Sequence, residues 1–240
     1  MMKIAICLSG YFNSKKDLTS KGIDGFGHLT KHVFSKHDRI DVFIHSWDLE
    51  NKTVIEDLYS PYIVNSTFEE QIDFSSKEKF TAYPGYPPQR TIFSHLYSVQ
   101  KSFELLNKSQ KNYDWVIKSR FDVGRINRNS SGPHNSSNPY AVQCINFNSS
   151  LDNNYFYLAD WGYFDSEGPA DMWFYSSQKN MSKFSKIYDT LLNDMEPASD
   201  MESWAGKDNG GIVNTIKCYK WFLIKEDLWD LKKPLPTYWE

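Results

Sequence analysis

An arginine and an aspartate stand two positions apart at the end of an apolar segment. Residues 115–117, Trp-Val-Ile, form the core of that segment, and Arg120-Phe121-Asp122 follows it. A buried strand that ends in charge is where open α/β sheets place ligand chemistry. Arg120 can bind a phosphate through two parallel hydrogen bonds, and Asp122 can hold a hard divalent cation. The pair is equally compatible with a surface ion pair at a strand end.

Two earlier apolar segments, at residues 4–8 and 40–45, also end in polar or aromatic residues. The residues at these two ends are Ser9, Gly10, His45, Ser46, Trp47 and Asp48. Because the carboxyl ends of parallel strands share one edge of a sheet, we expect the three ends to converge on one site. A glycine after the first strand lets backbone N–H groups approach a nucleotide.

Three of the candidate residues have a structural alternative. His45 is either a site residue or a buried histidine bound to a backbone carbonyl. Trp47 either stacks on a base or packs in the core. Lys101 lies on the helix predicted before the Arg-x-Asp segment, where it either reaches ribose or phosphate or lies on a solvated face.

Apolar periodicity predicts alternating strands and helices in the first half of the chain and a mixed, loop-rich second half, hence an α/β fold. Predicted strands cover residues 4–8, 40–45, 62–64, 114–123, 155–158, 171–175 and 221–224. Predicted helices cover residues 27–35, 54–59, 91–107, 180–193 and 211–219. Residues 127–139, rich in Asn, Ser, Gly and Pro, are predicted to form a flexible loop beside the site.

Composition narrows the class of protein. The 240 residues are 40% hydrophobic and 16% aromatic, which indicates a folded globule, and one domain is the default. A net charge of −3 with scattered Lys and Arg gives no support for a nucleic-acid ligand. Three widely spaced cysteines favour a reduced, cytoplasmic protein. We expect neither a signal peptide nor a membrane span, and no Gly-rich ATP or NAD motif follows a strand.

Three motifs together resemble a group of bacterial and large-virus or phage glycosyltransferases of the GT-A type, including those of lipopolysaccharide synthesis. They are residues 4–10 (Ile-Ala-Ile-Cys-Leu-Ser-Gly), residues 41–47 (Asp-Val-Phe-Ile-His-Ser-Trp) and residues 114–123 around Arg120 and Asp122. Residues 171–188 are similar to the acceptor-half strand and helix of these enzymes. The resemblance implies a GT-A-like, Rossmann-related sheet in one domain, with a nucleotide-sugar half at 1–126 and an acceptor half at 140–240.

The same resemblance implies a donor site with a metal ion. In such enzymes an Asp-x-Asp element holds a cation that bridges the donor diphosphate, and here only Asp122 carries over as ligand of Mn²⁺ or Mg²⁺. This sequence has Arg-x-Asp in place of that element, so the first of the two carboxylates is absent. The implied donor-binding residues are Ser9, Gly10, His45, Trp47, Lys101, Arg120 and Asp122.

Direct displacement of the nucleotide requires a carboxylate that accepts the proton of the acceptor hydroxyl. Asp171 is the first candidate, since apolar neighbours are expected to raise its pKa, and Glu202 is the second. An aromatic group in this half can stack on sugars or simply pack in the core. Its members are Tyr155, Tyr157, Trp161, Tyr163, Trp173 and Tyr175.

The sequence therefore predicts transfer of a sugar from a nucleotide-sugar donor to a glycan or lipid-linked acceptor. One alternative is a non-catalytic module that binds a nucleotide sugar or a glycan without a working base. Another is a sulfo- or nucleotidyltransferase on a similar α/β sheet.

Overall fold

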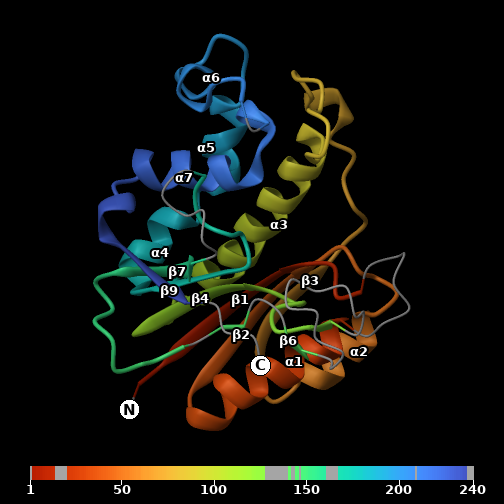
Figure 1. The fold of residues 1–240 in the computed structure, drawn as a ribbon. Helices are drawn as coiled ribbons and strands as arrows, with labels where there is room; N and C mark the ends of the chain where they lie inside the picture. Colours follow the sequence, from red (N-terminus) through yellow and green to blue (C-terminus); the bar gives the residue numbers. More distant parts are fainter. Residues whose placement is uncertain are drawn as a thin grey trace.

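A seven-stranded sheet forms the centre of the computed structural model (Figure 1). The structure describes residues 2–13, 21–127, 140–141, 144–145, 147–160, 167–208 and 210–236. The strand order is β3-β2-β1-β4-β8-β7-β9. Strand bounds are β1 Ile4–Gly10, β2 Ile40–Ser46, β3 Ile63–Phe68, β4 Trp115–Arg120, β7 Phe156–Asp160, β8 Trp173–Ser176 and β9 Lys232–Pro236. A separate two-stranded sheet pairs β5 (Ile126–Asn127) with β6 (Tyr140–Ala141).

All strands of the large sheet except β8 run in the same direction. β1 pairs in parallel with both β2 and β4, and β2 pairs in parallel with β3. β8 is antiparallel to β4 and β7, so β7 and its parallel partner β9 have the direction of β1 again. The predicted α/β fold with a mostly parallel sheet and a mixed second half is confirmed.

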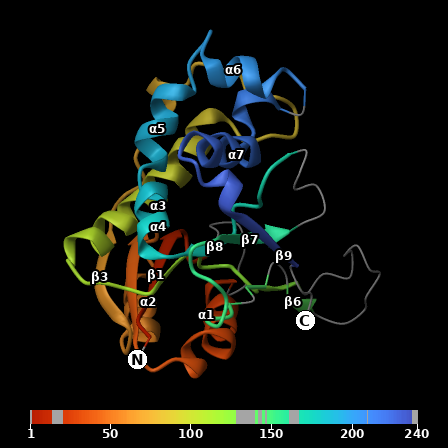
Figure 2. The same ribbon diagram turned by 90° about the vertical axis from the view of Figure 1, so that its left-hand side faces the viewer.

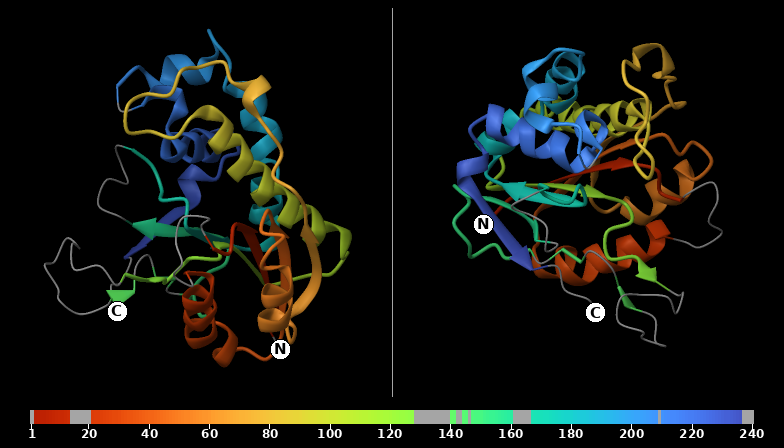
Figure 3. Two further views of the ribbon diagram at one scale, coloured as in Figure 1. Left: turned by 90° about the vertical axis from the view of Figure 1, so that its right-hand side faces the viewer. Right: turned by 45° about the horizontal axis from the view of Figure 1, so that its top comes forward.

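Helices cover both faces of this sheet (Figures 1 and 2). Alternate residues of β1 point to opposite faces: Ile4, Ile6 and Leu8 pack with α1 and α2, whereas Ala5 and Cys7 pack with α3, α4, α5 and α7. Figure 3 shows α1, coloured red, on the face opposite the yellow-green α3. Helix bounds are α1 Lys21–His32, α2 Lys52–Tyr59, α3 Gln89–Lys108, α4 Gln178–Phe184, α5 Ile187–Asp194, α6 Asp200–Ala205 and α7 Thr215–Lys225.

The predicted last strand was wrong, and the predicted last helix was right only from residue 215 onward. The predicted strand at 221–224 lies inside α7, and residues 211–213 form a separate turn of 3₁₀ helix. Asn214 caps α7, since its side chain accepts hydrogen bonds from the backbone N–H groups of Ile216 and Lys217. Cys218, Tyr219, Phe222 and Leu223 then bury one helical face. Two aromatic residues and a leucine within this helix have the composition that is typical of a short buried strand, which led to the wrong prediction.

Other boundaries also differ from the prediction. The helix expected at 27–35 is α1 at Lys21–His32, followed by a 3₁₀ turn at Phe34–Lys36. The expected helix at 180–193 is divided into α4 and α5. β4 ends at Arg120, so Asp122 lies in the following turn and not in the strand. The predicted loop at 127–139 lies, apart from residue 127 in β5, outside the described residues. The single domain with halves at 1–126 and 140–240 stays a prediction, although strands from both halves join one sheet.

None of the described helices is long and apolar enough to cross a membrane.

The turn after β4 packs closely on α1. A Cβ atom on Gly25 of α1 would lie 1.8 Å from the backbone oxygen of Phe121. Gly124, with φ of +71°, has the same constraint, because a Cβ there would lie 2.1 Å from the His28 ring. Helix α1 therefore supports the turn that carries Asp122, at a distance that only glycine permits.

Gly25→Ala tests this support. The added methyl group meets backbone, which cannot rotate away, so we expect the free energy of unfolding to fall by about 1–3 kcal/mol. Gly27→Ala is the matched control, because Gly27 lies on the same helix with nothing within 4 Å of its added Cβ. That change should leave stability equal or up to about 1 kcal/mol higher. Equal effects of both substitutions in urea unfolding would show that the packing of α1 on the turn is unimportant.

Candidate functional site

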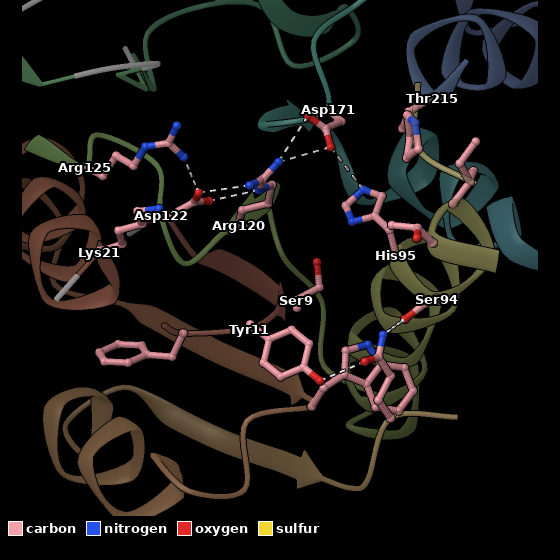
Figure 4. A pocket seen from close by; sticks show the side chains of 17 residues that line it. Ser9, Tyr11, Lys21, Ser94, His95, Arg120, Asp122, Arg125, Asp171 and Thr215 are labelled. Atoms are coloured by element: carbon pink, nitrogen blue, oxygen red, sulfur yellow. Dashed lines mark hydrogen bonds and ion pairs between the residues drawn. The ribbon is translucent and has the colours of Figure 1, made fainter. Parts of the chain in front are cut away.

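A cavity of about 670 Å³ opens at the carboxyl ends of β1 and β4 (Figure 4). From β1 the chain crosses through α1 to β2, and after β3 it returns through α3 to β4 on the other side of β1. The strand order thus reverses between β1 and β4, which is where open α/β sheets bind ligands. The cavity is lined by Ser9, Gly10, Tyr11, Phe12, Lys21, Trp47, Gln71, Pro87, Thr91, Ile92, Ser94, His95, Arg120, Asp122, Arg125, Asp171 and Thr215.

Two arginines share one carboxylate at the end of β4. Arg120 Nε and Nη2 each donate to a different oxygen of Asp122, both at 2.9 Å. Arg125 Nη1 donates to Asp122 Oδ2 at 2.6 Å. The backbone N–H of Arg125 also donates to the Asp122 carbonyl, which closes the turn. Asp122 therefore orients both guanidinium groups at the cavity wall.

Arg120 has a second carboxylate partner, from the other half of the chain. Its Nη1 lies 3.2 Å from Oδ2 and 3.4 Å from Oδ1 of Asp171, just before β8. Asp171 Oδ2 lies 3.6 Å from His95 Nε2 on α3, and His95 Nε2 also contacts the Tyr219 hydroxyl at 2.8 Å. Figure 4 shows Arg120 between Asp122 and Asp171, with His95 beyond Asp171. One polar chain thus joins β4, β8, α3 and α7.

Lys118 lies in the core beside this chain of contacts. Its side chain is fully buried, donates to the backbone carbonyl of Asp171, and lies 5.3 Å from the Phe174 ring and 5.5 Å from the Tyr219 ring. Burial lowers the pKa of Lys118 to about 7, and the attraction of Asp171 offsets only part of that effect. The lysine is therefore partly neutral near pH 7.

The carboxylates of Asp122 and Asp171 stay ionised. Burial alone would raise the pKa of Asp171, but Arg120, His95 and Lys118 outweigh burial and hold this pKa well below its usual range. The expectation that apolar neighbours raise the pKa of Asp171 was therefore wrong. Asp122 also has a lowered pKa, since Arg120 and Arg125 outweigh its burial. Burial lowers the pKa of His95 to about 3, so its imidazole is neutral at ordinary pH.

Two buried polar atoms of the cavity wall have no hydrogen-bond partner among the described residues. They are Ser9 Oγ and Trp47 Nε1, whose residues are 2% and 5% exposed. A buried polar atom without a partner costs free energy comparable to a lost hydrogen bond. Figure 4 shows the Ser9 hydroxyl directed into the cavity, below Arg120. Both atoms are suited to bind polar groups of a ligand.

Six of the nine predicted site residues meet at the cavity, and these are Ser9, Gly10, Trp47, Arg120, Asp122 and Asp171. The backbone of Gly10 is less available to a nucleotide than expected. Its N–H donates to Ser98 Oγ, and its carbonyl accepts from Ser46 Oγ. Trp47 stacks on Tyr97 with ring centroids 5.4 Å apart, so it also packs in the core.

The other three predicted residues do not line the cavity. The ring of His45 is buried, as the structural alternative expected, but its partners are the side chains of Ser98 (Oγ at 2.8 Å) and Glu69 (3.0 Å) and not a backbone carbonyl. Lys101 pairs with Glu104 at 2.7 Å. Glu202 accepts a hydrogen bond from the backbone N–H of Ala198 at the start of α6. A role of these three residues in binding or catalysis stays a prediction.

Most of the described members of the aromatic group in the second half belong to the core. Tyr157, Trp173 and Tyr175 are at most 4% exposed, and Tyr175 stacks on both of the others. Packing therefore explains these rings, and they offer no face to a sugar. Tyr155 is 36% exposed, whereas Trp161 and Tyr163 lie outside the described residues.

The sequence analysis missed several cavity residues, most importantly Arg125, His95 and Lys21. Arg125 was detectable, since it follows Asp122 by three residues in a turn with glycine. His95 carried no signal, because a histidine on an amphipathic helix has no distinctive spacing. Its role depends on α3, β8 and α7 meeting at one place.

The donor set does not fit a divalent cation as the side chains lie. No three described His, Cys, Asp or Glu side chains lie close enough together to hold a metal ion. Both oxygens of Asp122 accept hydrogen bonds from arginine, and Asp171 is paired with Arg120. Ca²⁺ and Mg²⁺ sites are built from oxygen ligands. Metal binding at Asp122 stays a prediction that these contacts do not favour.

Comparisons with known proteins give low similarity. No family model matches the chain, and no curated protein matches it. Two crystal structures of the glycosyltransferase GlyE of Streptococcus pneumoniae TIGR4 superpose with TM-scores of 0.45. The apo form is 10% identical, covering 94% of this chain and 44% of GlyE, and the other is 11% identical, covering 98% and 45%. The chain thus spans less than half the length of GlyE.

A third structure is that of a glycosyltransferase involved in the glycosylation of the major capsid of PBCV-1. It is 15% identical, covers 82% of this chain and 68% of its own, and has a TM-score of 0.35. At these values the comparisons assign no family to the chain.

Lys118→Met tests the buried charge beside the site. The folded-state pKa of Lys118, about 7, lies below the value near 10.4 expected in the unfolded chain. The unfolded state therefore binds more protons between these values, and wild-type stability should rise with pH relative to the variant by at most about 1.4 kcal/mol per pH unit. Urea unfolding at pH 7 and pH 9 should show a relative gain of about 2 kcal/mol.

Lys77→Met is the matched control, because Lys77 is exposed. It should show no such pH dependence. If the free energies of unfolding of the wild type and Lys118→Met differ by the same amount at pH 7 and pH 9, burial does not hold this lysine partly neutral.

Proposed function

We propose that this protein is a glycosyltransferase that uses a nucleotide-sugar donor. The observation that carries the proposal is the cavity at the carboxyl ends of β1 and β4, where two guanidinium groups and a carboxylate from the second half meet. Its volume of about 670 Å³ lies within the range of small-molecule and cofactor sites.

The β4 end supports binding of a diphosphate leaving group. Arg120 and Arg125 are held side by side through Asp122, at the edge where parallel strands end. When the bond from sugar to diphosphate breaks, negative charge grows on the diphosphate oxygens. Guanidinium groups already held in place stabilise that charge without reorganising during the reaction. Ser9 Oγ offers a further hydrogen bond on the β1 side.

The adjoining wall, next to Arg120, supports binding of an acceptor. Asp171, His95 and Thr215 come from the segment before β8, from α3 and from the start of α7, and they line the same cavity. A hydroxyl acceptor must lose its proton as it attacks, so a base is needed on this wall. We propose Asp171 for that role, with His95 as its neighbour. A bound diphosphate would offset the charge of Arg120, which otherwise lowers the pKa of Asp171.

One observation favours a second candidate, a non-catalytic module that binds a nucleotide sugar. The ion pair with Arg120 and the low pKa of Asp171 make this carboxylate a weak base in the free protein. A module of this kind would keep the arginine-lined wall and bind donors without turnover.

Asp171→Asn separates the two candidates. The amide keeps an oxygen that can accept from Arg120 but cannot take a proton. If Asp171 is the base, release of nucleoside diphosphate from the best donor in a nucleotide-sugar and acceptor panel should fall 10²- to 10⁴-fold. Donor affinity, measured by calorimetry, should change by less than about threefold, well under the tenfold that corresponds to 1.4 kcal/mol.

Asp57→Asn is the matched control, since Asp57 is exposed on α2 and does not line the cavity. It should leave turnover near the wild-type rate. Near-normal turnover in Asp171→Asn would reject Asp171 as base, and wild-type binding of donors without any turnover would favour the binding module.

A further inference from the structure

Arginine side chains cover Asp122 at the cavity wall. The Asp122 side chain is 12% exposed, whereas those of Arg120 and Arg125 are 32% and 33% exposed. A carboxylate that binds a metal ion and a substrate together must present its oxygens to the cavity. Here the guanidinium groups occupy that position, as Figure 4 shows for Arg120 and Arg125 on either side of Asp122.

The local charge also opposes a divalent cation. Asp122 and Asp171 together carry two negative charges, and Arg120 and Arg125 carry two positive charges that contact them. Lys118 adds further positive charge beneath Asp171 whenever it is protonated. A cation bound at Asp122 would lie beside two guanidinium groups, and it would find no excess of carboxylate to compensate for its lost water.

The arginines keep donors for a ligand. Arg120 makes four contacts to the two carboxylates, one from Nε, one from Nη2 and two from Nη1, so at least one of its five N–H groups, on Nη2, remains. No described residue accepts a hydrogen bond from Nε or Nη2 of Arg125, whose contact to Asp122 goes through Nη1. Two planar guanidinium groups held by one carboxylate can direct their N–H donors at the oxygens of a phosphate group.

We propose that this site binds the diphosphate of its ligand through Arg120 and Arg125 without a divalent cation, and that Asp122 serves as the group that positions both arginines. The inference deepens the proposed function, because a diphosphate is the leaving group of that reaction. It replaces the metal ion of the sequence-based expectation with two guanidinium groups of the chain itself.

The test uses inorganic pyrophosphate as probe, measured by calorimetry on the whole chain in EDTA and again with Mg²⁺ or Mn²⁺. We expect binding in EDTA that is as tight as, or tighter than, binding with metal, since metal ions neutralise pyrophosphate before it meets the arginines. Arg125→Gln should weaken binding in EDTA at least tenfold. Asp122→Asn should retain binding within about tenfold, because both guanidinium groups remain.

Arg39→Gln is the matched control for the charge change. Arg39 is exposed and precedes β2, at the amino-terminal edge of the sheet. It should leave pyrophosphate affinity unchanged. Thermal unfolding of each variant checks that the fold is intact, and Arg125→Lys supplies a milder change, which should restore the charge but only part of the affinity.

Binding that appears only with Mg²⁺ or Mn²⁺ and vanishes in Asp122→Asn would overturn the proposal in favour of a metal site. Absence of binding in both conditions would overturn it too, because no diphosphate site would then exist. Sugar transfer assayed in EDTA separates the two hypotheses. If pyrophosphate binds without metal but no sugar is transferred, the glycosyltransferase function is rejected and the metal-free diphosphate site is retained. If sugar transfer requires a metal ion, the metal-free site is rejected and the glycosyltransferase function is retained.

Discussion

Arg120 holds the two sides of the candidate site together. It binds Asp122 through two hydrogen bonds of 2.9 Å and Asp171 at 3.2 Å, so one guanidinium joins the end of β4 to the segment before β8. These partly buried charges compensate one another, and removing one partner would leave another charge unpaired in a poorly solvated place. The positions of Arg125 and His95 depend on the same carboxylates. A displacement of Arg120 would therefore affect groups on both sides of the site.

The sheet explains why these residues meet. β4 lies next to β1 on one side and next to the antiparallel β8 on the other. The carboxyl end of β4 therefore faces the residues that precede β8, which brings Asp171 beside Arg120 although 50 residues lie between them in the chain. Helix α3 crosses the same face and adds His95, while α1 supports the turn with Asp122 through the contact at Gly25. Neighbouring strands of opposite direction thus create a wall with groups from both halves.

The sequence allowed the parallel half to be predicted well, because its signals are local. Apolar runs ending in Ser9, Trp47 and Arg120 marked three strands, and the rule for parallel strands placed these ends at one edge. The weak predictions were those that depended on distant partners. The pKa of Asp171 is lowered by Arg120, His95 and Lys118, whereas its sequence neighbours suggested the opposite. α7 was divided wrongly, since its buried aromatic residues have the composition of a strand.

The most direct test of the account is a crystal structure of the chain with a nucleoside diphosphate, grown in EDTA. The account predicts diphosphate oxygens within hydrogen-bond distance of the guanidinium groups of Arg120 and Arg125, with the Asp122 contacts to both arginines intact. It also predicts that the terminal phosphate points toward the wall with Asp171 and His95. A diphosphate bound elsewhere, or seated on Asp122 only after both arginines have moved away and a metal ion is supplied, would contradict it.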